Sequence, residues 1–149
     1  MKKFPEFDKY QISPKRAIKK LKSLFLTKDE IEFAYLFGSY ALNKNVTLSD
    51  IDVAVFLKNA NENPYYQFIL VEEIMSALLS NNVDLIVLNN ADILLKYQIV
   101  SHGLIIKDRP GLRQNFEAEN LSRYMDFNYI NKIHLIAFKN RIKDGKYFG

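Results

Sequence analysis

The chain has 149 residues, the usual size of one domain, and with 48% hydrophobic and 26% charged residues it is not a disordered chain. Its net charge of +4 is a mild basic excess, and the lack of cysteine excludes disulfides, thiolate metal sites and a cysteine nucleophile. Because neither a signal-peptide pattern nor an apolar run of roughly 20 residues is found, we expect a cytoplasmic protein with no membrane partner.

Helical and strand patterns alternate along the chain. Ser13-Pro14 predicts the start of a helix, because serine caps free N–H groups and proline suits the first turn, and an apolar face continues to about Leu26. The basic residues of this helix are interpreted as a solvated face, and no direct nucleic-acid binding is expected. The later elements are predicted as strands at Ile31–Phe37, Ile51–Leu57, Val83–Leu88 and Leu104–Lys107, and as helical segments at Tyr40–Leu42, Tyr65–Ser80, Ala91–Val100 and Leu112–Lys143.

This order predicts an α+β fold in a single domain spanning 1–149. The helical crossover between the second and third strands implies that these two strands run parallel. We expect a small mixed sheet of about four strands flanked by helices, with a core at about 28–108 and a helical C-terminal segment at about 111–146, as one long helix or a broken pair. The aromatic residues of that segment are Tyr124, Phe127, Tyr129 and Phe138. We interpret them mostly as core residues, and a surface that docks a partner is the alternative.

The stretch from Gly38 to Asp52 holds the residues best suited to chemistry. Gly38 ends a strand and lets the backbone approach a ligand closely, because it has no Cβ. Ser39 then stands at a helix start, where free N–H groups and its hydroxyl favour phosphate oxygens. Asp50 and Asp52 are two residues apart at the start of a strand, so both side chains leave the same face. Such carboxylates repel each other unless a cation lies between them, and Mg²⁺ is the natural candidate.

Asp84 repeats this pattern as the second residue of the next strand. If the two strands are parallel, Asp84 lies at the same edge of the sheet as Asp50 and Asp52. Three carboxylates at one edge, facing a phosphate-binding turn, describe a two-metal site for phosphoryl transfer. Each piece alone is common in turns and caps, but four fixed residues at fixed spacing arise by chance once in ~10⁵ starting positions.

Gly38-Ser39, ten further residues and Asp50-x-Asp52 resemble the signature of the DNA polymerase β-type nucleotidyltransferase superfamily. The chain as a whole is similar to the minimal nucleotidyltransferase antitoxins (the MntA type), which are partners of HEPN-domain ribonuclease toxins. The segment from Val83 to Ala91 is similar to the segment of that family that holds the third carboxylate. Relatives commonly carry a basic residue and a glycine where Leu42-Asn43 stand here, and the nearest cation is Lys44.

The resemblance implies a nucleotidyltransferase fold and a protein adenylyltransferase that uses ATP and two Mg²⁺ ions. Such an enzyme would transfer AMP to a tyrosine hydroxyl of a cognate HEPN toxin, its partner in a hetero-oligomer, and so neutralise it. The implied catalytic residues and metal ligands are Asp50, Asp52 and Asp84, and the implied nucleotide-binding residues are Gly38, Ser39, Lys44 and Ser49. Two alternatives stay open: transfer to a small molecule such as an aminoglycoside, and a non-catalytic antitoxin that blocks the toxin by binding.

Two other groups of polar residues attract attention. His102 and His134 lack the spacing of a metal site and are interpreted as surface or interface residues. Arg109, Arg113 and Arg123 could face an acidic or phosphate-bearing partner, although charged helix faces are usually only solvated.

Overall fold

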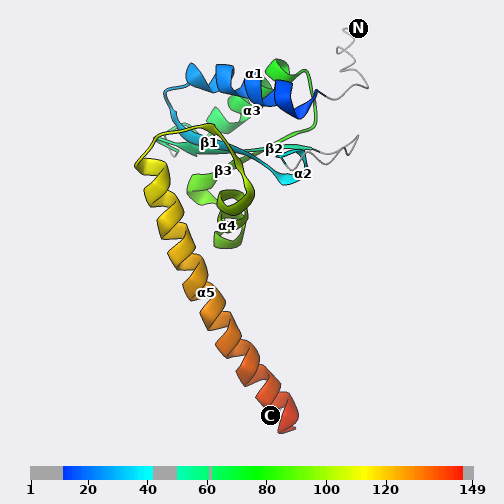
Figure 1. Cartoon of the computed structure of the whole chain (residues 1–149), viewed down its shortest axis with the longest axis vertical. Helices are drawn as coiled ribbons and strands as arrows, with labels where there is room; N and C mark the ends of the chain where they lie inside the picture. The colour runs from blue at the N-terminus through cyan, green and yellow to red at the C-terminus, as the bar shows by residue number, and fades with distance from the viewer. Residues whose placement is uncertain (1–11, 42–49, 61, 146–149) are drawn as a thin grey trace.

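The computed structural model describes residues 12–41, 50–60 and 62–145, with helices and strands alternating as predicted (Figure 1). The predicted elements are confirmed to within two residues at each end, except that the predicted end of the short helical segment, Leu42, lies outside the described residues. The C-terminal segment is one helix of 32 residues. The elements are α1 (Pro14–Leu26), β1 (Ile31–Phe37), α2 (Gly38–Ala41), β2 (Ile51–Leu57), α3 (Tyr66–Leu78), β3 (Val83–Val87), the 3₁₀ turn η1 (Leu88–Asn90), α4 (Ile93–His102), β4 (Leu104–Lys107) and α5 (Leu112–Lys143).

The four strands form one mixed sheet in the order β3-β2-β1-β4. β2 and β3 are parallel, which confirms the prediction from the helical crossover, whereas β1 is antiparallel to both β2 and β4. In this arrangement Phe37 at the end of β1 pairs with Asp52 of β2, and Asp52 pairs with Asp84 of β3. The end of β1 and the starts of β2 and β3 therefore meet at one edge of the sheet.

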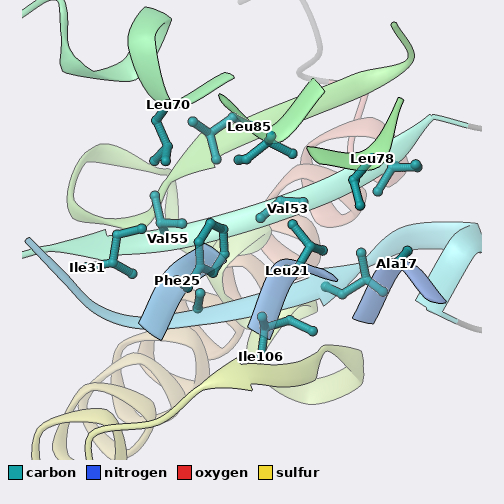
Figure 2. Packing of buried hydrophobic residues seen from close by; sticks show 14 of the residues in the cluster. Ala17, Leu21, Phe25, Ile31, Val53, Val55, Leu70, Leu78, Leu85 and Ile106 are labelled. Atoms are coloured by element: carbon teal, nitrogen blue, oxygen red, sulfur yellow. The ribbon is translucent and has the colours of Figure 1, made fainter. Parts of the chain in front are cut away.

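One face of the sheet is covered by α1 and α3 (Figure 2). Ser13 accepts a hydrogen bond from the Arg16 N–H and so caps α1, whose apolar face is fully buried at Leu21 and Phe25. Figure 2 shows these side chains packed toward Val53, which comes from the same face of β2. Each large apolar side chain buried in this way contributes about 1.5–3 kcal/mol. This core holds the strands in the register that brings the carboxylates together.

The opposite face carries a smaller aromatic cluster beside α4 and the start of α5. The rings of Phe33 and Phe56 stack with centroids 4.8 Å apart, and Phe116 of α5 packs against both. The buried Tyr35 hydroxyl donates a hydrogen bond of 2.6 Å to Glu117 Oε1, so β1 is tied directly to α5. The start of α5 is thus fixed on the face of the sheet that also bears Asp52 and Asp84.

Most of α5 extends away from the rest of the domain (Figure 1). Its early turns contact α4, where the rings of Tyr97 and Tyr124 stack at 3.6 Å, and Asn120 is its only buried residue. Further along, Tyr129 is 67% exposed and Phe138 46% exposed. The prediction that the aromatic residues of this segment are mostly core is therefore wrong. A helix of 32 residues is about 48 Å long, so most of it extends beyond the sheet.

The three arginines considered from the sequence pair with carboxylates of this same chain. Arg109 forms an ion pair with Glu32, Arg113 binds Asp108 and Glu117, and Arg123 pairs with Glu119 one turn away. Arg113 therefore extends the contact between Tyr35 and Glu117 and helps to fix the start of α5. His102 and His134 are exposed, in agreement with their interpretation as surface residues.

The buried side chain of Tyr40 in α2 allows a test of whether its hydroxyl lowers the stability of the fold. Its side chain is 5% exposed, and within the described residues its buried hydroxyl has no hydrogen-bond partner. An unpaired buried hydroxyl costs about 1–3 kcal/mol. We therefore expect Tyr40→Phe to raise the free energy of unfolding by about 1 kcal/mol in urea titrations, whereas Tyr35→Phe, which removes a real hydrogen bond, lowers it. An equal loss in both variants would mean that the Tyr40 hydroxyl is satisfied.

Candidate active site

Gly38 lies directly against the carboxylate of Asp52. The residue adopts φ +75°, a left-handed conformation that glycine tolerates at little cost. A Cβ at this position would lie 2.1 Å from Oδ2 of Asp52, which is far inside van der Waals contact. The sequence pattern does not predict this contact, because a ligand's close approach is enough to account for a glycine at this position. The antiparallel pairing of Phe37 with Asp52 is what produces it.

The three predicted carboxylates come from adjacent positions at this edge. Asp52 and Asp84 are direct neighbours in the parallel register of β2 and β3. Asp50 is exposed and directly precedes β2, and its negative charge is close enough to Asp52 to raise the pKa of that carboxyl. The alternation of side chains along β2 is confirmed by the core, because Ile51 and Val53 point into the cluster under α1 and α3. The strand pairing thus brings Asp52 and Asp84 together, with Asp50 beside them.

The pKa of Asp52 reflects this crowding. Burial raises it most, and the negative charges of Asp84 and Asp50 raise it further, to about 6. A carboxylate whose ionised form is disfavoured in this way is stabilised by a nearby cation. The side chains at the edge therefore favour binding of a positively charged ion.

The donor set suits Mg²⁺ bound together with a substrate. Among the described residues, no group of three or more His, Cys, Asp or Glu side chains is gathered closely enough to hold a metal ion by itself. Mg²⁺, however, usually takes only one or two carboxylates and completes its shell with water and substrate phosphates. The pair Asp52 and Asp84, with hard oxygen donors and mutual repulsion, fits that requirement.

The other predicted nucleotide-binding residues are placed only in part. Ser39 directly follows Gly38 in the first turn of α2, and its side chain is partly exposed. Lys44 and Ser49 lie outside the described residues. Gly38, Ser39 and the carboxylates therefore form the described part of the predicted site.

The raised pKa of Asp52 predicts how stability depends on pH. Because the folded state binds this proton more tightly than the unfolded chain, ionised Asp52 destabilises the metal-free protein above about pH 6, and this cost disappears as the pH falls toward about 4. The side chain is partly solvated, so we expect an effect on the order of 1 kcal/mol. Urea unfolding in EDTA at about pH 8 and about pH 5 should show it in the wild type and not in Asp52→Asn.

A second experiment measures how Mg²⁺ changes the stability of the wild type and of Asp52→Asn. Mg²⁺ added at about pH 8 should stabilise the wild type more than Asp52→Asn, because only the wild type has the full charge to neutralise. Identical pH profiles and identical Mg²⁺ responses in the two proteins would contradict a cation site at Asp52.

Comparison with known proteins places the chain in a family. The model of the family "Polymerase beta, Nucleotidyltransferase" matches residues 19–111, which include β1 to β4 and the edge that bears the carboxylates. The chain therefore belongs to the polymerase β-type nucleotidyltransferases. This confirms the nucleotidyltransferase fold that the sequence motif implied.

Individual relatives within this family include an adenylyltransferase and toxin–antitoxin complexes. The chain is 33% identical over 98 residues to the protein adenylyltransferase MntA of Shewanella oneidensis, covering 64% of this chain and 67% of that protein. It resembles a chain of a crystal structure of a toxin–antitoxin pair with AMP-PNP, with 25% identity and a TM-score of 0.66 over 85% of this chain and 98% of that one. A structure of the tri-AMPylated Shewanella oneidensis HEPN toxin in complex with MNT antitoxin matches with 25% identity, the same coverage and a TM-score of 0.63.

No helix in the described part of the chain is long and apolar enough to cross a membrane.

Proposed function

We propose that this protein is an antitoxin that transfers AMP from ATP to a tyrosine hydroxyl of a cognate HEPN toxin. The observation that carries the proposal is the pairing of Asp52 with Asp84 beside the Gly38 turn, in a chain of the nucleotidyltransferase family. The adenylyltransferase MntA and the complex with a tri-AMPylated HEPN toxin support the choice of AMP and of a protein acceptor. A cytoplasmic location and a single domain, with its core at about 28–108, belong to the same proposal.

The residues of the edge have distinct roles in this reaction. Asp50 and Asp52 would hold one cation, with Asp84 next to Asp52 as a shared ligand, and the bound cation would neutralise negative charge on the triphosphate. The Gly38 and Ser39 N–H groups and the Ser39 hydroxyl donate hydrogen bonds to the phosphates that leave as pyrophosphate. Lys44 and Ser49 complete the proposed nucleotide-binding set. Each donor acts at a fixed point of the sheet edge, so ATP is held in one orientation.

Asp84 acts on the acceptor. The tyrosine oxygen forms a bond to the α-phosphorus as the bond to pyrophosphate breaks, and the phenolic proton must leave. A free tyrosine titrates near pH ~10, so a carboxylate that accepts this proton assists the attack at neutral pH. Asp84 is exposed at the start of β3, where a protein acceptor can reach it. We assign it this role together with a share of the second metal site.

The exposed part of α5 is the proposed docking surface for the toxin. Its exposed apolar side chains are distributed around the helix among charged ones, and so large an exposed apolar area marks a site of interaction with another protein. Small-molecule nucleotidyltransferases need an acceptor pocket, whereas this chain continues after β4 into an extended helix. The docking surface consists of Leu121, Met125, Tyr129, Ile130, Ile133, Leu135, Ile136, Phe138 and Ile142.

Substitutions on α5 test this docking surface. Ile133 and Ile136 are 49% and 60% exposed, so Ile133→Gln/Ile136→Gln should change the free energy of unfolding by less than about 0.5 kcal/mol per site. We expect the same change to weaken toxin binding at least tenfold, roughly 1.4 kcal/mol or more, because each side chain is buried in the complex. Isothermal titration calorimetry with the toxin measures it. The matched control is Lys132→Gln/Lys139→Gln, and equal affinity in all three proteins would place the toxin elsewhere.

The mass of the toxin separates the enzymatic proposal from its alternatives. Incubation with ATP and Mg²⁺ should add whole AMP units to the toxin, located on tyrosine by peptide mapping, and restore growth when both proteins are expressed. Inhibition without a mass change would favour a non-catalytic antitoxin. An Asp50→Ala/Asp52→Ala variant that still modifies the toxin would refute the assigned site.

A further inference from the structure

The outer face of α1 is a continuous basic surface. The five cations of this helix occupy the side opposite its buried apolar residues, at positions that follow the 3.6-residue helical period. Four of them are exposed and Lys20 is half-buried. We call this surface the basic face of α1, and it consists of Lys15, Arg16, Lys19, Lys20 and Lys22.

This face holds the whole positive excess of the protein. The chain has a net charge of +4, and α1 contributes five positive and no negative side chains, so the remaining residues sum to −1. Within the described residues, none of these five cations forms an ion pair. By contrast, Lys28 pairs with Glu73 and the three arginines near and within α5 pair with carboxylates. The charge is therefore concentrated and left uncompensated at one place.

The surface beside the basic face is concave. A hollow of about 630 Å³ lies between α1 and α3, and its lining residues are Arg16, Lys19, Lys20, Ser23, Leu24, Thr27 and Ala77. α1 and α3 lie on one side of the sheet and α4 on the other (Figure 1). Asp52 and Asp84 share the α4 side with Ala54 and Ile86, which follow them by two residues, so the sheet separates them from the hollow. The basic face is thus distinct from the nucleotidyltransferase site.

We propose that the basic face of α1 binds a single-stranded nucleic acid through its phosphates, without reading the bases. This replaces the expectation from the sequence of a solvated face without nucleic-acid binding, because the five cations form no ion pair among the described residues and lie beside a hollow. Cations four residues apart on a helix are about 6 Å apart along its axis, an interval similar to that between successive phosphates of an extended strand. A groove bordered by such a row can follow one strand. The side chains that line the hollow include no aromatic ring, so base stacking does not add sequence preference.

A membrane surface fits the basic face less well. A helix that lies in a bilayer interface inserts its apolar face among the lipid chains. In α1 that face is occupied, because Ala17, Leu21 and Phe25 are fully buried against the sheet. Lipid headgroups could therefore bind this face only through its charge. The phosphates of a nucleic-acid strand could bind the same charges and also enter the hollow lined by Lys19 and Lys20.

Fluorescence anisotropy with a labelled uridine oligonucleotide of about 12 residues tests the proposal on the full chain without ATP. We expect Lys15→Gln/Lys19→Gln/Lys20→Gln to weaken binding at about 0.1 M KCl at least tenfold. The slope of log K against log salt should fall in magnitude by about 2, as expected for three lost contacts to a single strand. The control Lys132→Gln/Lys139→Gln/Lys143→Gln removes the same charge from α5 and should bind like the wild type.

Other outcomes would overturn the proposal. Equal weakening in both triple variants would mean that net charge alone drives binding. Displacement of the oligonucleotide by excess ATP and Mg²⁺ would place it in the nucleotidyltransferase site. Binding of phosphatidylserine vesicles or of an acidic peptide to the basic face, with no binding of the oligonucleotide, would assign the surface to that partner instead. Circular dichroism of both variants establishes that the helices are intact.

Discussion

Asp52→Asn should lower kcat/KM for toxin AMPylation by at least about 10³-fold. The variant keeps the shape of the side chain and removes only its charge, at the position where Asp84 is the direct neighbour in the sheet. A neutral amide is a poor ligand for Mg²⁺, and the negative charge that develops on the leaving pyrophosphate loses its counterion. The readouts are the mass of the toxin and the release of pyrophosphate from ATP.

Stability and activity are expected to change in opposite directions in this variant. Burial and two carboxylate neighbours raise the pKa of Asp52 to about 6, so removal of its charge relieves repulsion in the metal-free protein. Lost activity can therefore not be explained by unfolding. Asp29→Asn, an exposed carboxylate that precedes β1 and so lies at the far end of that strand, is the matched control and should retain full activity. Asp52→Asn with more than a tenth of wild-type activity would exclude Asp52 as a metal ligand.

Short-range sequence rules are sufficient to predict the helices and strands and the grouping of the carboxylates at one edge of the sheet. Ser13-Pro14 predicts the start of α1 because capping and the proline ring act within one turn. The pairing of Asp52 with Asp84 follows from the helical crossover, which forces β2 and β3 to be parallel. Both inferences need only short-range geometry and one rule of topology.

Features that depend on long-range register or on another molecule could not be read from the sequence. The contact between Gly38 and Asp52 arises from the antiparallel register of β1 and β2, which the sequence pattern leaves open. The apolar residues of α5 have the same helical spacing whether they pack on their own domain or on a partner, so the pattern predicts a core position for Tyr129, whose side chain is 67% exposed. Periodicity reports that a face is apolar and does not report what covers it.

Gly38→Ala should destabilise the protein by about 2–3 kcal/mol and reduce AMP transfer at least about a hundredfold. The new Cβ meets Oδ2 of Asp52 at 2.1 Å, so either the carboxylate rotates away or the end of β1 shifts from β2. The left-handed φ of +75° adds about 1–2 kcal/mol for any residue with a Cβ. Gly111→Ala provides the matched control, since φ is +88° there and a Cβ would have no neighbour within 4 Å.

A double-mutant cycle isolates the contact itself from the backbone penalty. In an Asp52→Ala background the carboxylate is absent, so Gly38→Ala should cost only the conformational term of a residue at positive φ. Urea unfolding of the four proteins of the cycle gives the coupling free energy, which we expect at about 1–2 kcal/mol. A coupling near zero would show that Asp52 moves aside freely. The glycine would then be required only for its backbone conformation, and the carboxylate would not be held in place by the turn that precedes it.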